Sequence, residues 1–595
     1  MAEGKTSWES AFQRFLETLN DVGLHEHGLI VLNGTSSVAQ LCQQEASKIR
    51  IPGRSEGELS GEFKTICELH KALVGTEARA DEPRQELGDQ VFDPEHVPGT
   101  PIWEFLQESC PFQNSLPVGY FYLITHFKLP TLGHHTFTVL NVNTNRSVSI
   151  AHADDIKWIV IDDAESSSRD YLYHLDFALS HEGVNLCILW FLFHSDKFSA
   201  STFELYILAC LQSEERSTAQ QMWFWYEFLT GKNLSLPDLG SASEPGPVFL
   251  LDPDIYHTPR PIPSPRHGIL ANQLGNRGFC PVLRKHLSSI PSQELAEKLR
   301  SALKQVPDGM VRSVRTTLYA AETTASYEIE YEYPSEDQVR SISQEIETIL
   351  SDASFAITED SLCSLNQTFL GNKSPTTYRN FQNWISTAYI PPKPSDVNSL
   401  MSSLLSCLDT ILDDPFIDPI TAATIIAIGF VDIHPFRDGN GRLHRFLLHF
   451  ILSRKGFYDP GIILPLSKGI LDSKEKYFES LRADRKYLMR VIDYTFDPQA
   501  DTLTVNNPIT HPWYRYPDMT ATANFLRDAL SATIDVHLPR EIASAIQLAE
   551  ALARLSSEAG IDEADGRKFL NKFLPSCGHL VIAQPRHITR RTRER

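Results

Sequence analysis

The chain of 595 residues is long enough for roughly three to four domains. Its 42% hydrophobic and 22% charged residues are ordinary for a soluble globular protein, and the formal net charge of −21 argues against nonspecific nucleic-acid binding. The longest strongly apolar run, near Leu186 to Phe193, is too short to span a membrane, and no apolar signal segment follows Met1. The nine cysteines are scattered without a Cys-x-x-Cys pair, which argues against a disulfide framework or a zinc site. We therefore expect a cytoplasmic protein.

Two regions come first in chain order. Residues 1–114 show a helical opening and a Gly/Ser/Glu-rich stretch near 53–61, and their role stays unknown. Residues 115–280 are expected to form an α+β accessory region, with helical patterns over 171–232. Its strands are predicted at Tyr120–Ile124, Phe137–Leu140 and Trp158–Ile161. Eight prolines between Pro237 and Pro265 mark a long loop before a mainly helical remainder.

A helical region is predicted over residues 281–352. Within it, residues 321–332 read Ala-Glu-Thr-Thr-Ala-Ser-Tyr-Glu-Ile-Glu-Tyr-Glu, and Pro334 follows shortly after. Ser335-Glu-Asp-Gln338 is a capping box, which predicts that one helix ends before Pro334 and another begins directly after it.

The most informative stretch is residues 434–445, which read His-Pro-Phe-Arg-Asp-Gly-Asn-Gly-Arg-Leu-His-Arg. An uncharged run of small and apolar residues over 420–431 predicts a buried helix before it, and Pro435 disfavours helix at His434. A second helix is expected to begin near Gly441 and to stop before Gly456. The loop then lies at a helix N-terminus, where free backbone N–H groups and the helix dipole bind anions.

The residue types in this loop suit a bound nucleotide. Phe436 is expected to anchor the loop in the core. The remaining candidates have one chemical task each: His434 as a base, Asp438 as a Mg²⁺ ligand, Gly439 and Gly441 for close approach of a phosphate, Asn440 as an amide donor, and Arg442 and Arg445 as forks onto phosphate oxygens from one helix face.

This stretch resembles the signature of the Fic family of nucleotidyltransferases, His-Pro-Phe-x-(Asp/Glu)-Gly-Asn-Gly-Arg-x-x-Arg, at every specified position. The resemblance implies transfer of AMP from ATP to a Ser, Thr or Tyr hydroxyl of a protein, with release of pyrophosphate. It implies His434 as base, Asp438 as Mg²⁺ ligand, Gly439–Gly441 as phosphate cradle, and Arg442 and Arg445 on the distal phosphates. Related kinases carry a lysine in this loop, so the retained glycines favour nucleotidyl over phosphoryl transfer.

A second resemblance concerns regulation. Many Fic proteins carry an inhibitory helix with the pattern (Ser/Thr)-x-x-x-Glu-(Gly/Asn), and Ser326 and Glu330 have that spacing here, while Tyr331 replaces Gly or Asn. A Glu330 carboxylate forked onto Arg445 would occupy the place of the γ-phosphate, so we expect an autoinhibited enzyme.

Other segments resemble long single-chain Fic proteins over roughly residues 115 to 575. Tyr378–Pro392 is similar to the flap, an extended hairpin over the active site that pairs with the target, and Tyr477 is a candidate for the adenine pocket, for the core or for the surface. The similarity in the flanking regions lies in His181–Leu186, Trp223–Lys232, Phe279–Val282 and Trp513–Thr522.

The expected fold is mainly α, an all-helical Fic core with a β-hairpin flap, an α+β N-terminal region and a helical C-terminal region. The core is placed at 353–495, and 496–595 end in a basic tail with five arginines from Arg586 to Arg595. The expected partners are ATP and a target-protein hydroxyl, without membrane or nucleic acid; self-modification and a homodimer stay open. Two alternatives also stay open: removal of AMP at the same site, and a non-catalytic, nucleotide-gated adaptor.

Overall fold

The computed structural model describes residues 101–559, except 113–114, 141–148, 154–155, 162–169, 213–215, 241–245, 287–289, 372–375, 386–388, 460 and 484. The chain divides into two compact units, one made of Met1–Asp89, Gln305–Thr317 and Leu538–Arg595, the other of Gln90–Lys304 and Leu318–His537. The Gly/Ser/Glu-rich stretch near 53–61, the helical opening and the basic tail lie outside the described residues.

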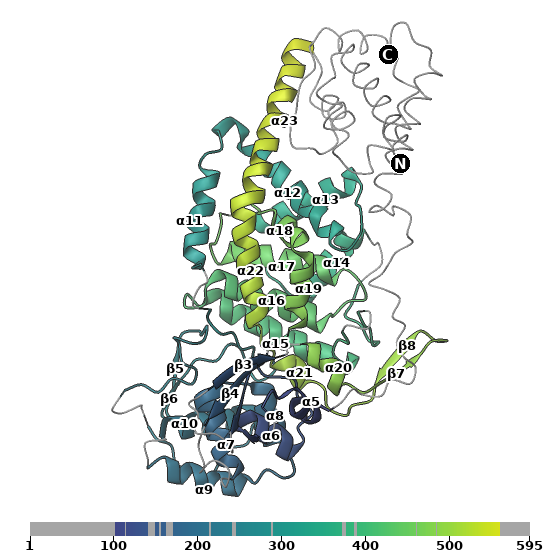
Figure 1. Ribbon diagram of the computed structural model, residues 1–595. Helices are drawn as coiled ribbons and strands as arrows, with labels where there is room; N and C mark the ends of the chain where they lie inside the picture. The colour runs from purple at the N-terminus through teal and green to yellow at the C-terminus, as the bar shows by residue number, and fades with distance from the viewer. Residues whose placement is uncertain are drawn as a thin grey trace, which may run out of the picture. The chain divides into compact units, whose positions relative to one another are not determined.

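The larger unit opens with a small α+β layer (Figure 1). Its first elements are α5 (Ile102–Ser109), β1 (Leu116–Val118), α6 (Gly119–Phe127), β2 (Thr136–Leu140), β3 (Ser149–Ala153) and β4 (Ile156–Ile161). The strands form one sheet in the order β1-β2-β4-β3, in which β2 and β4 are parallel and the outer pairs are antiparallel. The strands predicted near Phe137 and Trp158 are confirmed as β2 and β4.

The strand predicted at Tyr120–Ile124 is wrong, because these residues lie in α6. A short apolar run fits a buried helix as well as a strand. The Glu182 carboxylate accepts from the Tyr120 N–H at 2.7 Å and so satisfies a donor in the first turn of this helix. Phe121 then packs edge-on against Trp158 of the sheet, with ring centroids 5.5 Å apart.

Helices follow over the predicted 171–232 interval. They are α7 (Tyr171–Phe177), the π-helical η3 (Ala178–Glu182), α8 (Leu186–Phe193), α9 (Ala200–Cys210) and α10 (Arg216–Thr230). The proline-rich segment is largely irregular where it is described and ends in the hairpin of β5 (Ile262–Ser264) and β6 (Ile269–Ala271). The predicted long loop is confirmed there.

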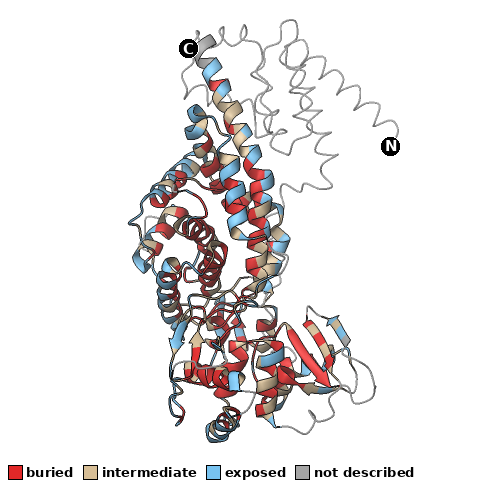
Figure 2. Ribbon diagram, turned by 90° about the vertical axis from the view of Figure 1, so that its left-hand side faces the viewer, coloured by how far each residue is buried: buried red, intermediate tan, exposed pale blue. Residues whose placement is uncertain are grey.

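The helical part of the larger unit contains many of the buried residues among those that the structure describes (Figure 2). Its elements up to the motif are α11 (Ser292–Leu303), α13 (Glu336–Ser351), α14 (Glu359–Leu370), α15 (Pro394–Asp413), α16 (Pro419–Ile433) and α17 (Asn440–Arg454). Every residue of α16 from Ile420 to Val431 is buried, since the run carries no charge. Asp418 caps its N-terminus by accepting from the Ile420 and Thr421 N–H groups. Helices α16 and α17 pack together more extensively than any other described pair.

The C-terminal part is helical with one exception. It contains α18 (Leu466–Asp472), α19 (Lys474–Arg482), η5 (Arg485–Tyr487), α20 (Leu488–Val491), α21 (Pro512–Arg515), α22 (Thr520–Ala532), η6 (Thr533–His537) and, in the other unit, α23 (Leu538–Ala559). The exception is the antiparallel hairpin β7 (Tyr494–Asp497) and β8 (Thr502–Val505), which the expectation of an all-helical region missed.

Helix α12 (Val311–Glu328) follows η4 (Asp308–Met310) and begins in the smaller unit, while its residues from Leu318 belong to the larger one. The capping box predicted at Ser335–Gln338 is present at the start of α13. The mainly helical fold is confirmed. No helix in the described ranges is both long and apolar enough to cross a bilayer.

Candidate functional site

His434 ends helix α16 in a left-handed conformation, with φ 52° and ψ 58°. Its backbone N–H still donates to the Phe430 carbonyl, at 3.0 Å. Its Nδ1 lies 3.1 Å from the Val431 carbonyl oxygen, and because a carbonyl only accepts, Nδ1 carries the proton. Burial lowers the pKa of His434 to about 4, so at neutral pH Nε2 keeps its lone pair. His434 Nε2 can therefore accept a proton.

The Asn440 side chain fixes the shape of the loop after His434 by binding the backbone of Phe436. Its Oδ1 accepts from the Phe436 N–H at 3.0 Å, and its Nδ2 donates to the Phe436 carbonyl at 2.9 Å. Phe436 itself is fully buried, as predicted. The Nδ2 amide carries a second N–H besides the one bound to Phe436, so the expected contact with a phosphate stays a prediction.

The start of α17 provides the close approach that the glycines predicted. Gly439 has φ 80°, and a Cβ there would lie 2.7 Å from Asn366 Nδ2. A Cβ on Gly441 would lie 2.2 Å from Glu330 Oε1. The space that the glycine leaves free at this helix N-terminus thus holds a carboxylate, which is an anion in a site suited to anions.

Glu330 bridges the two motif arginines. Its Oε1 accepts from Arg445 Nη2 at 2.7 Å, and its Oε2 accepts from Arg442 Nε at 2.9 Å. Burial alone would raise the pKa of Glu330, but the charges of Arg445 and Arg442 outweigh it and hold that pKa below its usual value. The predicted pairing with Arg445 is present, and the pairing with Arg442 was not foreseen.

Ser326 holds Arg445 from the other side. Arg445 Nε donates to Ser326 Oγ at 2.7 Å, and Nη2 donates to the Ser326 carbonyl at 2.6 Å. The Ser-x-x-x-Glu spacing therefore places both partners of one arginine on successive turns of the same segment.

The segment after α12 forms a tight turn around Tyr331, which has φ 58°. The left-handed region favours Gly or Asn, so the conformation accounts for the family pattern from which Tyr331 departs. Its exposed ring lies under Lys474 of α19, with Nζ 3.4 Å from the ring centroid. One residue later, Glu332 Oε1 accepts from Arg442 Nη2 at 2.5 Å.

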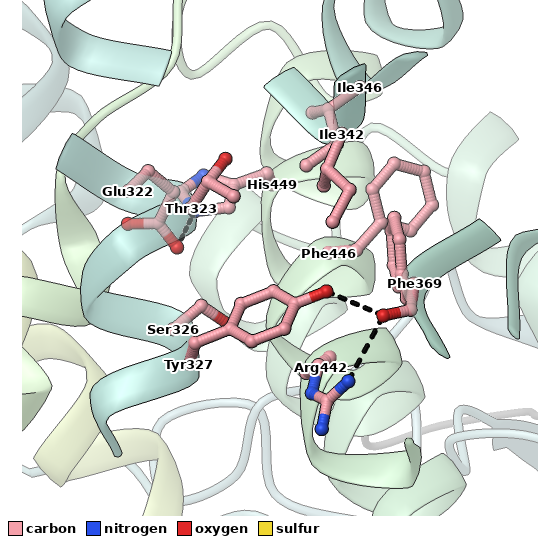
Figure 3. Close-up of a pocket in the computed structure, with 10 residues that line it drawn as sticks. All are labelled: Glu322, Thr323, Ser326, Tyr327, Ile342, Ile346, Phe369, Arg442, Phe446 and His449. Atoms are coloured by element: carbon pink, nitrogen blue, oxygen red, sulfur yellow. Dashed lines mark hydrogen bonds and ion pairs between the residues drawn. The ribbon is translucent and has the colours of Figure 1, made fainter. Parts of the chain in front are cut away.

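Arg442 is also held by the end of α14 (Figure 3). Its Nη1 and the Tyr327 hydroxyl both donate to the Phe369 carbonyl at the end of α14, and its guanidinium lies 4.3 Å from the Tyr327 ring centroid. Phe446 lies in the same cluster, beside a cavity of about 20 Å³. A cavity of this size holds a single water, so it offers no room for a nucleotide.

The flap contains a residue that sequence reasoning missed. Arg379 is buried and donates only to carbonyl oxygens: from Nε to His434 at 2.9 Å, from Nη1 to Phe381 at 3.0 Å, and from Nη2 to Pro392 at 2.6 Å. It therefore joins both ends of the flap to the backbone of the base. No local pattern distinguishes such an arginine from a surface one, so the sequence carried no signal for it.

The rest of the flap is described only in part. Ile385 and Tyr389 pair as an antiparallel bridge, in keeping with the predicted hairpin. The Tyr389 hydroxyl donates to the Asp432 carbonyl at 2.6 Å, and Trp384 packs edge-on against Phe496 of the β7–β8 hairpin. Of the three settings open for Tyr477, the surface is excluded, because the side chain is buried beside His444. Burial raises its pKa to about 12, and the charge of the nearby Arg445 acts in the opposite direction.

Asp438 is the exposed carboxylate of the loop. Its Oδ1 accepts from the Gly439 N–H at 2.6 Å. No cluster of three or more His, Cys, Asp or Glu side chains suited to a metal occurs in the part of the chain that the structure describes. A single loop carboxylate fits Mg²⁺, which is commonly held by one or two carboxylates together with substrate phosphates.

Residues 356–452 match the sequence model of the Fic/DOC family. This range includes His434, the loop and both arginines, whereas Glu330 lies upstream of it.

Among curated proteins, the chain is 29% identical over 177 residues to protein adenylyltransferase Fic of Nematostella vectensis, covering 28% of this chain and 39% of that protein. It is 33% identical over 139 residues to protein adenylyltransferase fic-1 of Caenorhabditis elegans, covering 22% of this chain and 25% of that protein. The chain thus spans well under half the length of these relatives.

Among solved structures, similarity is found to a Fic domain containing signaling protein from Bacteroides thetaiotaomicron, with TM-score 0.31 and 18% identity over 42% of this chain and 96% of that one. A Fic-1 fragment from C. elegans is also found, with TM-score 0.26 and 19% identity over 41% of this chain and 70% of that one.

Proposed function

Since residues 356–452 match the sequence model of the Fic/DOC family, we propose that this chain transfers AMP from ATP to a hydroxyl group of a protein. The observation that carries the proposal is the neutral His434 imidazole held next to a helix N-terminus that already accommodates an anion.

In the proposed reaction, His434 Nε2 takes the proton of the target Ser, Thr or Tyr hydroxyl. The hydroxyl oxygen forms a bond to the α-phosphorus of ATP, and the bond from that phosphorus to the bridging oxygen of pyrophosphate breaks. Pyrophosphate leaves with the electron pair, and its charge is stabilised by Arg442, Arg445 and the N–H groups that begin α17.

Asp438 is the residue that would hold Mg²⁺, which neutralises phosphate charge when bound. Arg379 does not meet the nucleotide in this scheme. It keeps the flap, and with it the target segment, in register with His434.

We further propose that Glu330 inhibits the enzyme by occupying the place of a distal phosphate. The contacts that support this are the two arginine pairings and the position beside Gly441. If the closed arrangement dominates at about 99:1, productive affinity for ATP falls about 100-fold.

The test uses ATP labelled at the α or the γ phosphate, with wild type, Glu330→Gly and Glu330→Gly/His434→Ala. AMP transfer predicts α label on protein, sharply more in Glu330→Gly than in wild type, and none above background in the double variant. Adding Arg445→Ala to Glu330→Gly should reverse the gain. Label from γ would mean a kinase instead.

Two other outcomes match the alternatives. Equal α labelling in wild type and Glu330→Gly would contradict inhibition by Glu330. No labelling by any variant, together with release of AMP from a modified target by the wild type but not by Glu330→Gly, would assign Glu330 to the reverse reaction. Nucleotide binding without either activity would favour the non-catalytic, nucleotide-gated adaptor.

A further inference from the structure

Arg442 is held by more of the inhibitory segment than Glu330 alone. Its Nε is bound by Glu330 and its Nη1 by the Phe369 carbonyl. The remaining nitrogen, Nη2, donates to Glu332 at 2.5 Å. The Arg442 side chain is 4% exposed, so each nitrogen of a buried guanidinium is engaged in the closed arrangement.

We propose that Glu332 is a second inhibitory carboxylate, which acts with Glu330 to keep Arg442 away from the nucleotide. This rests on the proposed function, since it concerns regulation of the same site. An incoming triphosphate would then have to displace two carboxylates from this arginine, and not one.

The backbone of the turn brings the two carboxylates together. The N–H groups of Glu330 and Glu332 both donate to the Tyr327 carbonyl, at 2.9 and 3.1 Å. Tyr331, between them, takes the left-handed conformation, which is unfavourable for a residue with a Cβ. The turn reverses the chain there, and in this conformation both carboxylates reach one arginine.

The contact with Lys474 holds the turn from outside. Its ammonium lies over the Tyr331 ring, so the turn is fixed between α17 and α19. The strength of the Glu332 pair is moderate, because its side chain is 51% exposed and solvent weakens the pairing. We therefore expect Glu332 to contribute less to inhibition than Glu330, which is bound to both arginines.

The experiment compares Glu332→Gln with Glu328→Gln in the full chain. Both changes remove one negative charge from the same segment, and the structure shows no ion pair for Glu328 among the residues it describes. Affinity for ATP with Mg²⁺ is measured by titration calorimetry, and hydrogen exchange is followed at the amides of residues 330–332 without nucleotide. Glu330→Gly serves as the positive control for both measurements.

We expect Glu332→Gln to bind ATP about three- to tenfold more tightly than wild type. The amide hydrogens of residues 330–332 should exchange faster by a similar factor. Glu328→Gln should stay within about twofold of wild type in both measurements. If the two Gln variants behave alike, or if Glu332→Gln changes neither quantity, Glu332 is not inhibitory.

These measurements are independent of the chemical step. If AMP transfer is absent from every variant, the proposed function fails, while exchange of the turn still decides whether Glu332 holds it closed. If transfer is present and rises in Glu330→Gly but Glu332→Gln matches Glu328→Gln, the proposed function stands and the role of Glu332 fails.

Discussion

At the scale of single residues, the site depends on one imidazole whose protonation is fixed by its surroundings. His434 donates through Nδ1 to Val431, and burial disfavours its charged form, with Arg379 adding a repulsive positive charge. Desolvation is the larger effect, and it favours the neutral ring. The nearby carboxylates of Glu330 and Asp438 act in the opposite direction and are outweighed.

The pH dependence of transfer by Glu330→Gly should report this shift. The base is active when neutral, and its pKa is lowered to about 4, so the rate should be flat from about pH 6 to 8 and fall only below about pH 5. Initial rates with α-labelled ATP at saturating substrate measure it. A midpoint near the ordinary histidine value of about 6.5 would show that the ring is charged more easily than its burial implies.

Asp438→Ala should weaken the binding of Mg²⁺, because the loop has no other carboxylate. We expect the metal concentration at half-maximal rate to rise by about tenfold or more and the maximal rate to fall. A Mg²⁺ titration of the Glu330→Gly enzyme, with and without Asp438→Ala, measures both quantities. Unchanged midpoint and maximum would remove Asp438 from the metal site.

At the scale of elements, the site is a helix–loop–helix with a flap tied to it, and the sequence predicted these parts unequally. The helices on either side of the motif followed from the uncharged run before His434 and from the glycine turn. The pairing of Glu330 with Arg445 was predictable from a short spacing pattern. The bond from Arg379 to His434 was not, because its acceptor is a backbone carbonyl, which leaves no pattern of residue types in the sequence.

The errors have physical causes too. Tyr120–Ile124 was predicted as a strand, since aromatic and branched apolar residues suit both a buried strand and a buried helix. The helix is favoured by Glu182, a residue far along the chain whose carboxylate binds the first turn. The bonds of Asn440 to Phe436 were also missed, because the chemistry of the side chain does not show which loop atoms it reaches.

Arg379→Lys should separate the flap from the base. A lysine keeps the charge but lacks the planar guanidinium that reaches several carbonyls at once. Some buried carbonyls then lose their hydrogen bond, which costs about 1–3 kcal/mol of stability for each. We expect the KM for the protein target to rise and kcat to fall by about tenfold or more, while ATP affinity changes by less than about twofold. Target titrations and nucleotide binding measure the two effects.

The control for this change is Arg437→Lys. Arg437 is exposed and its guanidinium lies 4.8 Å from the Phe381 ring, so it touches the flap without binding the base. It should stay close to wild type in both measurements. Equal defects in the two variants would mean that the flap responds to any nearby change.

At the scale of the whole molecule, segments far apart in sequence hold the larger unit together. The Cys280 and Val282 N–H groups donate to the carbonyls of Arg515 and Pro517, at 2.8 and 3.0 Å. Both segments were singled out for their likeness to long Fic proteins, and the structure shows that they pair with each other. Phe279, in the first of them, is buried against Gly429 of α16, where an added Cβ would lie 2.7 Å from its ring.

Phe279→Ala should destabilise the larger unit by about 3–5 kcal/mol, the usual cost of emptying a buried aromatic site. Urea unfolding followed by tryptophan fluorescence measures the change. Phe416→Ala is the matched control, because Phe416 is 61% exposed and its removal should cost less than about 0.5 kcal/mol. Equal midpoints for the two variants would show that the accessory region and α16 are not coupled through Phe279.

The carboxylate that lies beside Gly441 belongs to the same polypeptide as the arginines that it binds. An inhibitor attached in this way has a local concentration set by the chain and not by the amount of protein present. If Glu330 inhibits as proposed, dilution therefore leaves the balance between the closed and open forms unchanged. Under the proposed function, the concentration of nucleotide sets how many molecules are open. The rate should therefore keep rising almost in proportion to the ATP concentration, even at concentrations far above the dissociation constant that the open site would have by itself.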